Sequence, residues 1–157
     1  MSKLIIDQFY TAFQKKDWKS MQALYHDDAT FSDPVFQNLT SKEVKAMWHM
    51  LLTASKDLEL TFTNVSGDDN KGSCRWDAFY SFSRTGRKVH NIITANFVFK
   101  KGKIAAHLDH FDLWKWSGMA LGWTGKLLGW SPLIKNKIRD MARKNLVKFI
   151  SEHHEYQ

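Results

Sequence analysis

The segment LYHDDATFSDPVF, residues 24–36, divides this chain into two kinds of structure. The residues on its N-terminal side repeat their apolar side chains at helical spacing, and this segment does not. A residue that precedes a proline avoids the helical backbone region, so Asp33, ahead of Pro34, must be extended or in a turn. We therefore expect helical structure to give way to extended structure here.

Three helices are predicted around this segment. Residues 3–15 carry apolar side chains at helical spacing, and Asp17 can cap a short second helix. Residues 40–43, TSKE, match the capping box, in which a threonine and a glutamate satisfy free N–H groups at a helix start. The apolar stripe that follows them predicts the third helix.

Beyond the third helix the apolar period becomes two residues, which is typical of strands. Residues 58–63 and 73–82 alternate in this way, whereas residues 88–99 are apolar on both faces at their centre and indicate an interior strand. The turns between the strands are short (SGDDNKG, RTGR and KKGK). Long strands joined by short turns predict an antiparallel meander, so the expected fold class is α+β.

Four titratable residues are concentrated in IAAHLDHFDLWKW, residues 104–116. Successive side chains of a strand point to opposite faces, so His107 and Asp109 would share one face, and His110 and Asp112 the other. A transition-metal site needs three or four converging ligands, and each face offers two. We therefore expect no metal and no other cofactor here.

Arg75, Asp77 and Phe79 share one face of the strand predicted at residues 73–82. We expect this face to lie beside Asp109. An arginine between two carboxylates is an acid/base device, because the repelling acids can hold one proton between them. The alternative is a surface ion pair between Arg75 and Asp77, which contributes little to stability.

The order of the elements, and residues 24–36 in particular, resembles the nuclear transport factor two-like superfamily. This superfamily includes ketosteroid isomerases, SnoaL-like polyketide cyclases and limonene epoxide hydrolase. For residues 1–116 the resemblance implies a curved antiparallel sheet that forms a cone around N-terminal helices and encloses an apolar pocket. We expect a homodimer, and residues 117–157 to add an apolar segment and an amphipathic helix that packs on the cone or on a partner.

The resemblance to the epoxide hydrolase implies a catalytic set. Arg75-Trp76-Asp77 and the LDHFD segment with Asp109 match its motifs. Asp109 would deprotonate a water molecule, Asp77 would protonate the leaving oxygen, and Arg75 would hold both. Phe31 and Asp33 stand where the hydrolase has a tyrosine and an asparagine. The leading hypothesis is therefore water addition to a small apolar molecule.

The resemblance to the isomerases implies Asp33 as the catalytic base. Phe9 stands at the position of their oxyanion tyrosine, although Tyr10 is adjacent, and residues 94–95 carry no carboxyl group where the isomerases have an acid. Such donors stabilise the developing charge, so their absence disfavours steroid-type isomerisation. An isomerase or cyclase with Asp33 as base is therefore the alternative to the hydrolase. A non-catalytic ligand-binding module, associated with a membrane surface through its tail, is a third hypothesis.

His107 is either a second acid/base group or a hydrogen-bonded residue of the pocket rim. Six residues are expected to line the pocket by the same alternation and helical placement: Phe9, Phe31, Trp48, Phe79, Ile93 and Phe111. Aromatic residues at such spacing could equally be core residues.

The net charge of +7 is concentrated in the tail, since residues 126–148 alone carry +6. Ser131-Pro132 opens a basic amphipathic helix behind a Trp-rich segment. Residues 117–150 could contact an anionic membrane surface, or the basic face could simply be solvated. No nucleic-acid-binding motif is present, so nucleic acid is not an expected partner.

The lone cysteine, Cys74, excludes an internal disulfide framework and is expected to be a packed thiol. The N-terminus lacks the apolar core of a signal peptide, and no run approaches the roughly 20 apolar residues of a membrane span. The expected location is the cytoplasm.

Overall fold

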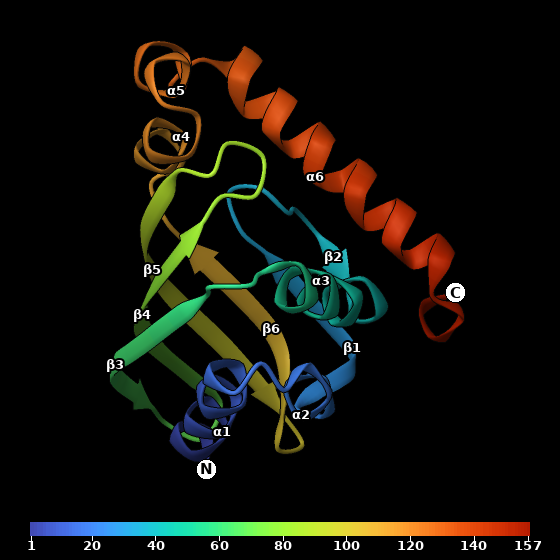
Figure 1. The fold of residues 1–157 in the computed structure, drawn as a ribbon. Helices are drawn as coiled ribbons and strands as arrows, with labels where there is room; N and C mark the ends of the chain where they lie inside the picture. The colour runs from blue at the N-terminus through green and yellow to red at the C-terminus, as the bar shows by residue number, and fades with distance from the viewer.

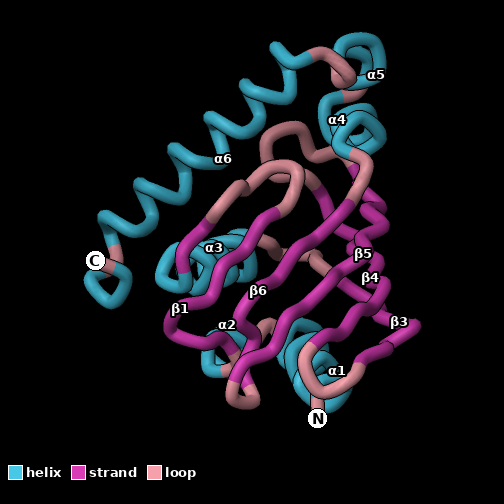
Figure 2. The backbone as a smooth tube through the Cα atoms, turned by 180° about the vertical axis from the view of Figure 1, so that it is seen from behind, coloured by secondary structure: helices cyan, strands magenta, loops and turns pink.

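A computed structural model describes residues 1–157. Six strands form one curved sheet in the order β2-β1-β6-β5-β4-β3, and three N-terminal helices lie within its curve (Figure 1). The view from behind shows the sheet in front of these helices (Figure 2). The predicted α+β class and the cone of the nuclear transport factor two-like fold are confirmed.

The N-terminal helices begin where the sequence predicts. They are α1 (Ser2–Gln14), α2 (Trp18–Ala23) and α3 (Ser41–Ala54). The Asp17 side chain accepts a hydrogen bond from the Ser20 N–H at the start of α2. At α3, the Thr40 hydroxyl accepts from the Glu43 N–H while the Glu43 carboxylate accepts from the Thr40 N–H, which is the predicted capping box.

Antiparallel pairing joins the four long strands, β3 (Glu59–Gly67), β4 (Lys71–Ser81), β5 (Lys88–Lys100) and β6 (Lys103–His110). The strand β1 (Tyr25–Ser32) pairs parallel with β6 and antiparallel with the short β2 (Leu39–Thr40). Because β1 and β6 run parallel, they end at the same edge of the sheet, which we call the mouth of the cone.

Aromatic rings fill the space between the sheet and the helices. Phe9 of α1 is fully buried, and six aromatic rings lie within 6.4 Å of its centroid, among them Tyr25, Trp48 and His107. Their edge-to-face contacts add to the area that they bury. The α1 helix therefore occupies the centre of the cone.

Three helices follow the sheet. They are α4 (Leu113–Leu121), α5 (Trp123–Leu128) and α6 (Pro132–Glu152), with a short 3-10 helix, η1 (His154–Tyr156), at the end. The Asp112 side chain caps α4, so this residue ends the strand segment and does not belong to a strand face. Figure 1 shows α4 and α5 beyond one end of the sheet and α6 running back along the cone.

The α6 helix contacts α3, and its Leu146 is fully buried in the same apolar cluster as α1 and α3. A second apolar cluster joins α4 to the sheet through Val89, Leu113, Trp116 and Ala120. None of the helices combines the length and apolar content that crossing a bilayer requires.

Candidate active site

A chain of hydrogen bonds runs through the interior of the cone. The Asp109 Oδ1 lies 3.0 Å from His107 Nε2, and His107 Nδ1 lies 2.7 Å from the Tyr25 hydroxyl. Trp48 Nε1 donates to that hydroxyl at 2.9 Å. The hydrogens all find acceptors when Tyr25 donates to Nδ1 and His107 donates from Nε2 to the Asp109 carboxylate. In this assignment His107 lies between a phenol and a carboxylate, as an acceptor at Nδ1 and a donor at Nε2.

This chain of hydrogen bonds is almost fully removed from solvent, since His107 is 2 % and Asp109 3 % exposed. Burial raises the pKa of Tyr25 well above 10, and the Asp109 charge raises it further, while the Trp48 hydrogen bond opposes the change. Buried carboxylates require partners, and the His107 N–H supplies one to Asp109. Phe9, Phe31 and Phe97 cover His107, with ring centroids 5.5, 5.0 and 4.2 Å away.

Asp33 lies at the mouth of the cone, directly after β1. Its Oδ1 accepts hydrogen bonds from the N–H groups of Val35 and Phe36 at 2.6 and 2.5 Å. Its Oδ2 makes no hydrogen bond within the protein, so one oxygen is held in place while the other has no partner. Asp33 lies outside any helix, directly before the bend at residues 34–36, as its position ahead of Pro34 requires.

Burial raises the pKa of Asp33 from 3.8 to about 7. The N–H donors of Phe36 and Val35 lower the pKa, whereas the negative charge of Asp109 raises it further. The removal of water around the carboxyl therefore outweighs its hydrogen bonds. At neutral pH the protonated and ionised forms of Asp33 are both populated.

A tyrosine and a tryptophan complete the polar groups of the mouth. Trp116 of α4 donates from Nε1 to the Tyr80 hydroxyl at 2.7 Å. Burial raises the pKa of Tyr80, and the Asp33 charge contributes to this increase. Arg139 of α6 donates to the Pro34 carbonyl oxygen at 2.9 Å. The tail helices therefore contact the segment that carries Asp33.

The structure places Arg75 and Asp77 on the outer face of the sheet, contrary to the expectation that they lie beside Asp109. Ala95 of β5 pairs with Cys74 on one side and with Asp109 on the other, so these three share the inner face. Arg75 pairs with Thr94, which in turn pairs with His110 on the outer face. The predicted set of Arg75, Asp77 and Asp109 is therefore not assembled.

On the outer face the alternative interpretation holds, because Arg75 and Asp77 form an ion pair. Arg75 donates to both Asp77 oxygens at 3.0 and 3.1 Å, and His90 Nε2 lies 2.9 Å from Oδ1. The Arg75 hydrogen bonds lower the pKa of Asp77. Phe79 is 41 % exposed and stacks on His90 at 4.2 Å, so it does not line the interior either.

The other predicted pocket residues face the interior or the mouth. Ile93 is buried on the inner face, and Phe111 is half-buried between the two apolar clusters. Two surface cavities, of about 590 and 760 Å³, are lined by other residues, mostly basic and polar. No three His, Cys, Asp or Glu side chains are grouped as metal ligands.

Tyr25 and Tyr80 were not predicted as site residues. The signal for Tyr80 was its place in the apolar alternation of Cys74, Trp76 and Ala78, which identifies the inner face of β4. Tyr25 adjoins the polar residues 26–28, and its link to His107 depends on parallel pairing between strands far apart in sequence. Local periodicity does not reveal such pairing.

Residues 6–107 match the SnoaL-like domain, and the chain belongs to this family. No protein with curated annotation is significantly similar in sequence. The ketosteroid isomerase-like fold is shown by a protein from Catenulispora acidiphila in complex with trimethylamine, at a TM-score of 0.67 and 12 % identity, with 82 % of this chain and 97 % of that chain covered.

Two further structures share the fold. A putative polyketide cyclase from Xanthomonas campestris is 15 % identical, with a TM-score of 0.64 and coverage of 75 % of this chain and 95 % of that one. An epoxide hydrolase of M. tuberculosis that resembles limonene epoxide hydrolase is 14 % identical, with a TM-score of 0.63 and coverage of 82 % and 96 %. Likeness at this level of identity establishes the fold, which hosts several chemistries.

Proposed function

We propose that the protein is an acid–base enzyme that moves a proton on a small apolar molecule, with Asp33 as the proton-transfer group. The observation that carries this proposal is the Asp33 carboxyl at the mouth of the cone, with a pKa of about 7 and an oxygen free of hydrogen bonds. The reaction class is isomerisation or cyclisation through proton abstraction.

A general acid/base group is most effective when its pKa lies near the working pH, because it can then accept and return the same proton. Asp33 meets this condition at neutral pH. The Val35 and Phe36 N–H groups fix Oδ1, so Oδ2 is presented in one orientation. Fixed orientation of the reacting group lowers the entropy cost of the proton transfer.

Asp109 and His107 act on this step through charge and position. Both are buried beneath aromatic rings, so a substrate at the mouth reaches Asp33 first. The negative charge of Asp109 raises the pKa of Asp33 and so makes it a stronger base. The hydrogen bond from His107 Nε2 holds the Asp109 carboxyl in place in this apolar surrounding.

Proton transfer is favoured over water addition, because the hydrolase chemistry needs an acid and a base on opposite sides of the bond that breaks. The acid and the arginine expected for that role, Asp77 and Arg75, lie on the outer face, where they pair with each other and with His90.

A non-catalytic ligand-binding module is the second candidate. The burial of His107 beneath Phe9, Phe31 and Trp48 favours it, because this titratable group is then out of reach of a substrate. A binding module needs only an apolar cleft, whereas an enzyme must also expose its reacting group.

Assays with lipophilic β,γ-unsaturated ketones and with lipophilic epoxides separate the candidates. We expect turnover of the ketones, a loss of about 100-fold or more in Asp33→Asn, and no change in Asp27→Asn, whose side chain is 95 % exposed. Epoxide turnover that depends on Asp77 would support the hydrolase instead. Saturable binding of both compounds without turnover would support the binding module.

We also propose that the protein is a cytoplasmic homodimer that pairs through the outer face of the sheet. Phe79, Ile92, Val98 and Leu108 are 37–42 % exposed there, and an apolar sheet face of this kind can be covered by a second copy. The buried free thiol of Cys74 is compatible with a reducing compartment. Sedimentation analysis of Val98→Glu together with Leu108→Glu should report a monomer.

A further inference from the structure

An exposed apolar surface surrounds α5, far from the α1 end of the cone (Figure 1). We call it the α5 tip and define it by six side chains with their exposed fractions: Trp114 50 %, Trp123 77 %, Leu127 64 %, Leu128 48 %, Trp130 57 % and Leu133 75 %. Single exposed apolar residues are ordinary, but six within twenty residues form a patch, and such patches mark interaction sites.

Close helix packing holds the tip in this shape. Gly125 and Gly129 lie against Ser117 of α4, where a Cβ atom on either glycine would overlap the Ser117 atoms. The Ser117 hydroxyl donates to the carbonyl oxygens of Trp114 and Gly125 at 2.8 and 3.2 Å. Because α4 and α5 are joined so tightly, the large side chains of α5 have no space on the inner side and remain outside.

Two indole N–H groups of the tip are already satisfied within the protein. Trp114 Nε1 donates to the Lys126 carbonyl oxygen and Trp130 Nε1 to the Leu127 carbonyl oxygen, both at 3.0 Å. Transfer of an indole into an apolar medium costs free energy if its N–H has no acceptor. These two rings avoid that cost, so the tip is suited to a partly apolar environment.

The segment that carries the tip is basic. Residues 113–139 contain five basic residues and no acidic one. Lys126 Nζ lies 5.4 Å above the Trp123 ring, so one cation sits directly on the apolar surface. Tryptophan beside lysine is the usual composition of protein segments at the boundary between lipid head groups and acyl chains.

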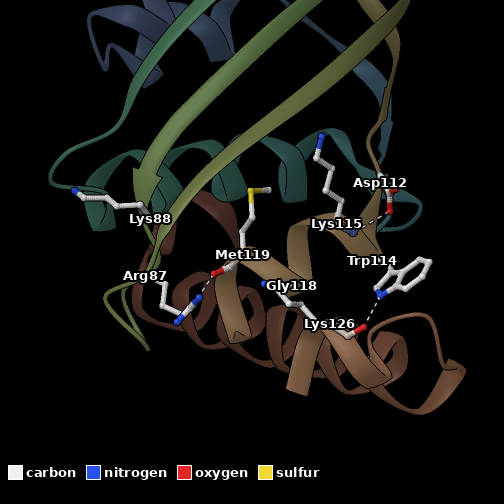
Figure 3. Close-up of a pocket in the computed structure, with 8 residues that line it drawn as sticks. All are labelled: Arg87, Lys88, Asp112, Trp114, Lys115, Gly118, Met119 and Lys126. Carbon is white, nitrogen blue, oxygen red and sulfur yellow. Dashed lines mark hydrogen bonds between the residues drawn. The ribbon is translucent and has the colours of Figure 1, made fainter. Parts of the chain in front are cut away.

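A basic groove of about 590 Å³ adjoins the tip (Figure 3). Arg87, Lys115 and Lys126 line it and form no ion pair, whereas Lys88 already binds Asp57. Its one carboxylate, Asp112, accepts from the Lys115 N–H as the cap of α4. Arg87 Nε donates to the Met119 carbonyl oxygen, so the two terminal nitrogens of this side chain can still donate to a phosphate oxygen.

We propose that the α5 tip and the basic groove bind the surface of an anionic phospholipid bilayer, with the apolar side chains among the upper acyl chains and the cations on lipid phosphates. Charge selects this partner over a second copy of the chain. A symmetric dimer brings the same patch of both copies together, so the lysines and Arg87 would face one another and repel. An anionic surface attracts them instead.

The proposed contact is with the bilayer surface. It places the mouth of the cone near the membrane, since α4 carries both Trp114 of the tip and Trp116 beside Tyr80. The inference does not depend on the proposed reaction.

Vesicle flotation of the full chain tests the proposal. Vesicles of phosphatidylcholine with about 30 mol% phosphatidylglycerol should carry the protein, and pure phosphatidylcholine vesicles should not. About 0.5 M sodium chloride should weaken binding, because it screens the charges of the surface. Binding at the same level to both vesicle types would overturn the proposal.

Two variants separate the apolar and the charged contributions. Trp123→Ser with Leu127→Ser should lower the vesicle partition coefficient by about tenfold or more, because partitioning scales with buried apolar area. Lys115→Glu with Lys126→Glu should remove the preference for anionic vesicles. Leu4→Ser is the matched control, since Leu4 is 60 % exposed on α1, and it should bind as the unchanged protein does.

The competing occupant has its own readout. If Trp123→Ser with Leu127→Ser leaves flotation unchanged but converts a dimer to a monomer in sedimentation, the tip is a protein interface and the membrane proposal is wrong. Circular dichroism should show that both double variants keep the helical content of the original chain.

Discussion

Replacement of Asp33 by asparagine should make the protein more stable at neutral pH. The folded state raises the pKa of this carboxyl from 3.8 to about 7, so between these values the folded chain binds more protons than the unfolded chain. The free energy of unfolding therefore falls as the pH rises through this range. Asparagine keeps an oxygen that can accept hydrogen bonds from the Val35 and Phe36 N–H groups, but it carries no charge. The variant therefore avoids this loss of stability as the pH rises.

The size of the effect follows from the pKa change. A difference of roughly three pKa units corresponds to about 4 kcal/mol at about pH 8, because each unit is about 1.4 kcal/mol. Near pH 4 the carboxyl is protonated in the folded state, so the two proteins should be almost equally stable. For a chain of this length, about 4 kcal/mol shifts the melting temperature by on the order of 10 °C.

Urea denaturation of both proteins at about pH 5 and pH 8 measures this difference directly. We expect the stability advantage of Asp33→Asn to grow by about 3 kcal/mol between these two conditions. Asp27→Asn is the matched control, because its exposed carboxylate is 95 % accessible and surface ion pairs contribute little. If the advantage of Asp33→Asn is independent of pH, the carboxyl is not destabilised by burial and the proposed catalytic pKa is wrong.

Three further predictions concern the interior and the tail. Tyr25→Phe leaves the Trp48 N–H and His107 Nδ1 without a partner, so it should lower the free energy of unfolding by about 3 kcal/mol; an unchanged urea midpoint would contradict the hydrogen-bond chain. The Cys74 thiol is 2 % exposed and burial raises its pKa to about 12, so an aromatic disulfide reagent should label it at least about 100-fold faster in denaturant than in the native state; rapid native labelling would refute this. Leu146→Ala should cost about 2–5 kcal/mol in one cooperative transition, unlike the 52 % exposed Val147→Ala; a separate early transition of α6 would show that the tail folds independently.

The fold was predictable because its signals are local. The capping box at Thr40, the turn before Pro34 and the two-residue period of β4 each act over a few residues, and each identifies its element. The α4–α5 hairpin was not recognised, because its glycines are typical of loops. Here they permit close contact between two helices.

The candidate site was only partly predictable, because it depends on which face of each strand turns inward. Asp33, Asp109 and His107 lie on the inner face or at the mouth, as expected. Arg75 and Asp77 do not, although the alternation already contained the information: the apolar set Cys74, Trp76 and Ala78 must face the core. The resemblance to the hydrolase motif predicted that the polar face of β4 turns inward. Burial of the apolar side chains requires the opposite face to do so.

A bulge in β6 illustrates what sequence periodicity omits. The register with β5 shifts between Val98 and Phe99, so that Phe99 pairs with Ile104 while Val98 pairs with Ala106. Ile104 and His107 are therefore both buried although they are three residues apart. One extra residue in a strand changes the face of everything beyond it, and the site residues lie beyond this bulge.

The parallel ladder between β1 and β6 sets the order in which the chain can fold. Tyr25 pairs with Ile104, so the first strand waits for a partner about 80 residues later, and closing so long a loop has an entropy cost. Long-range pairing of this kind slows folding. As the chain leaves the ribosome, Phe9, Tyr25 and Trp48 lack their partners on β6 until that strand has been synthesised. The aromatic-rich N-terminal part of the nascent chain therefore needs protection from aggregation during this period.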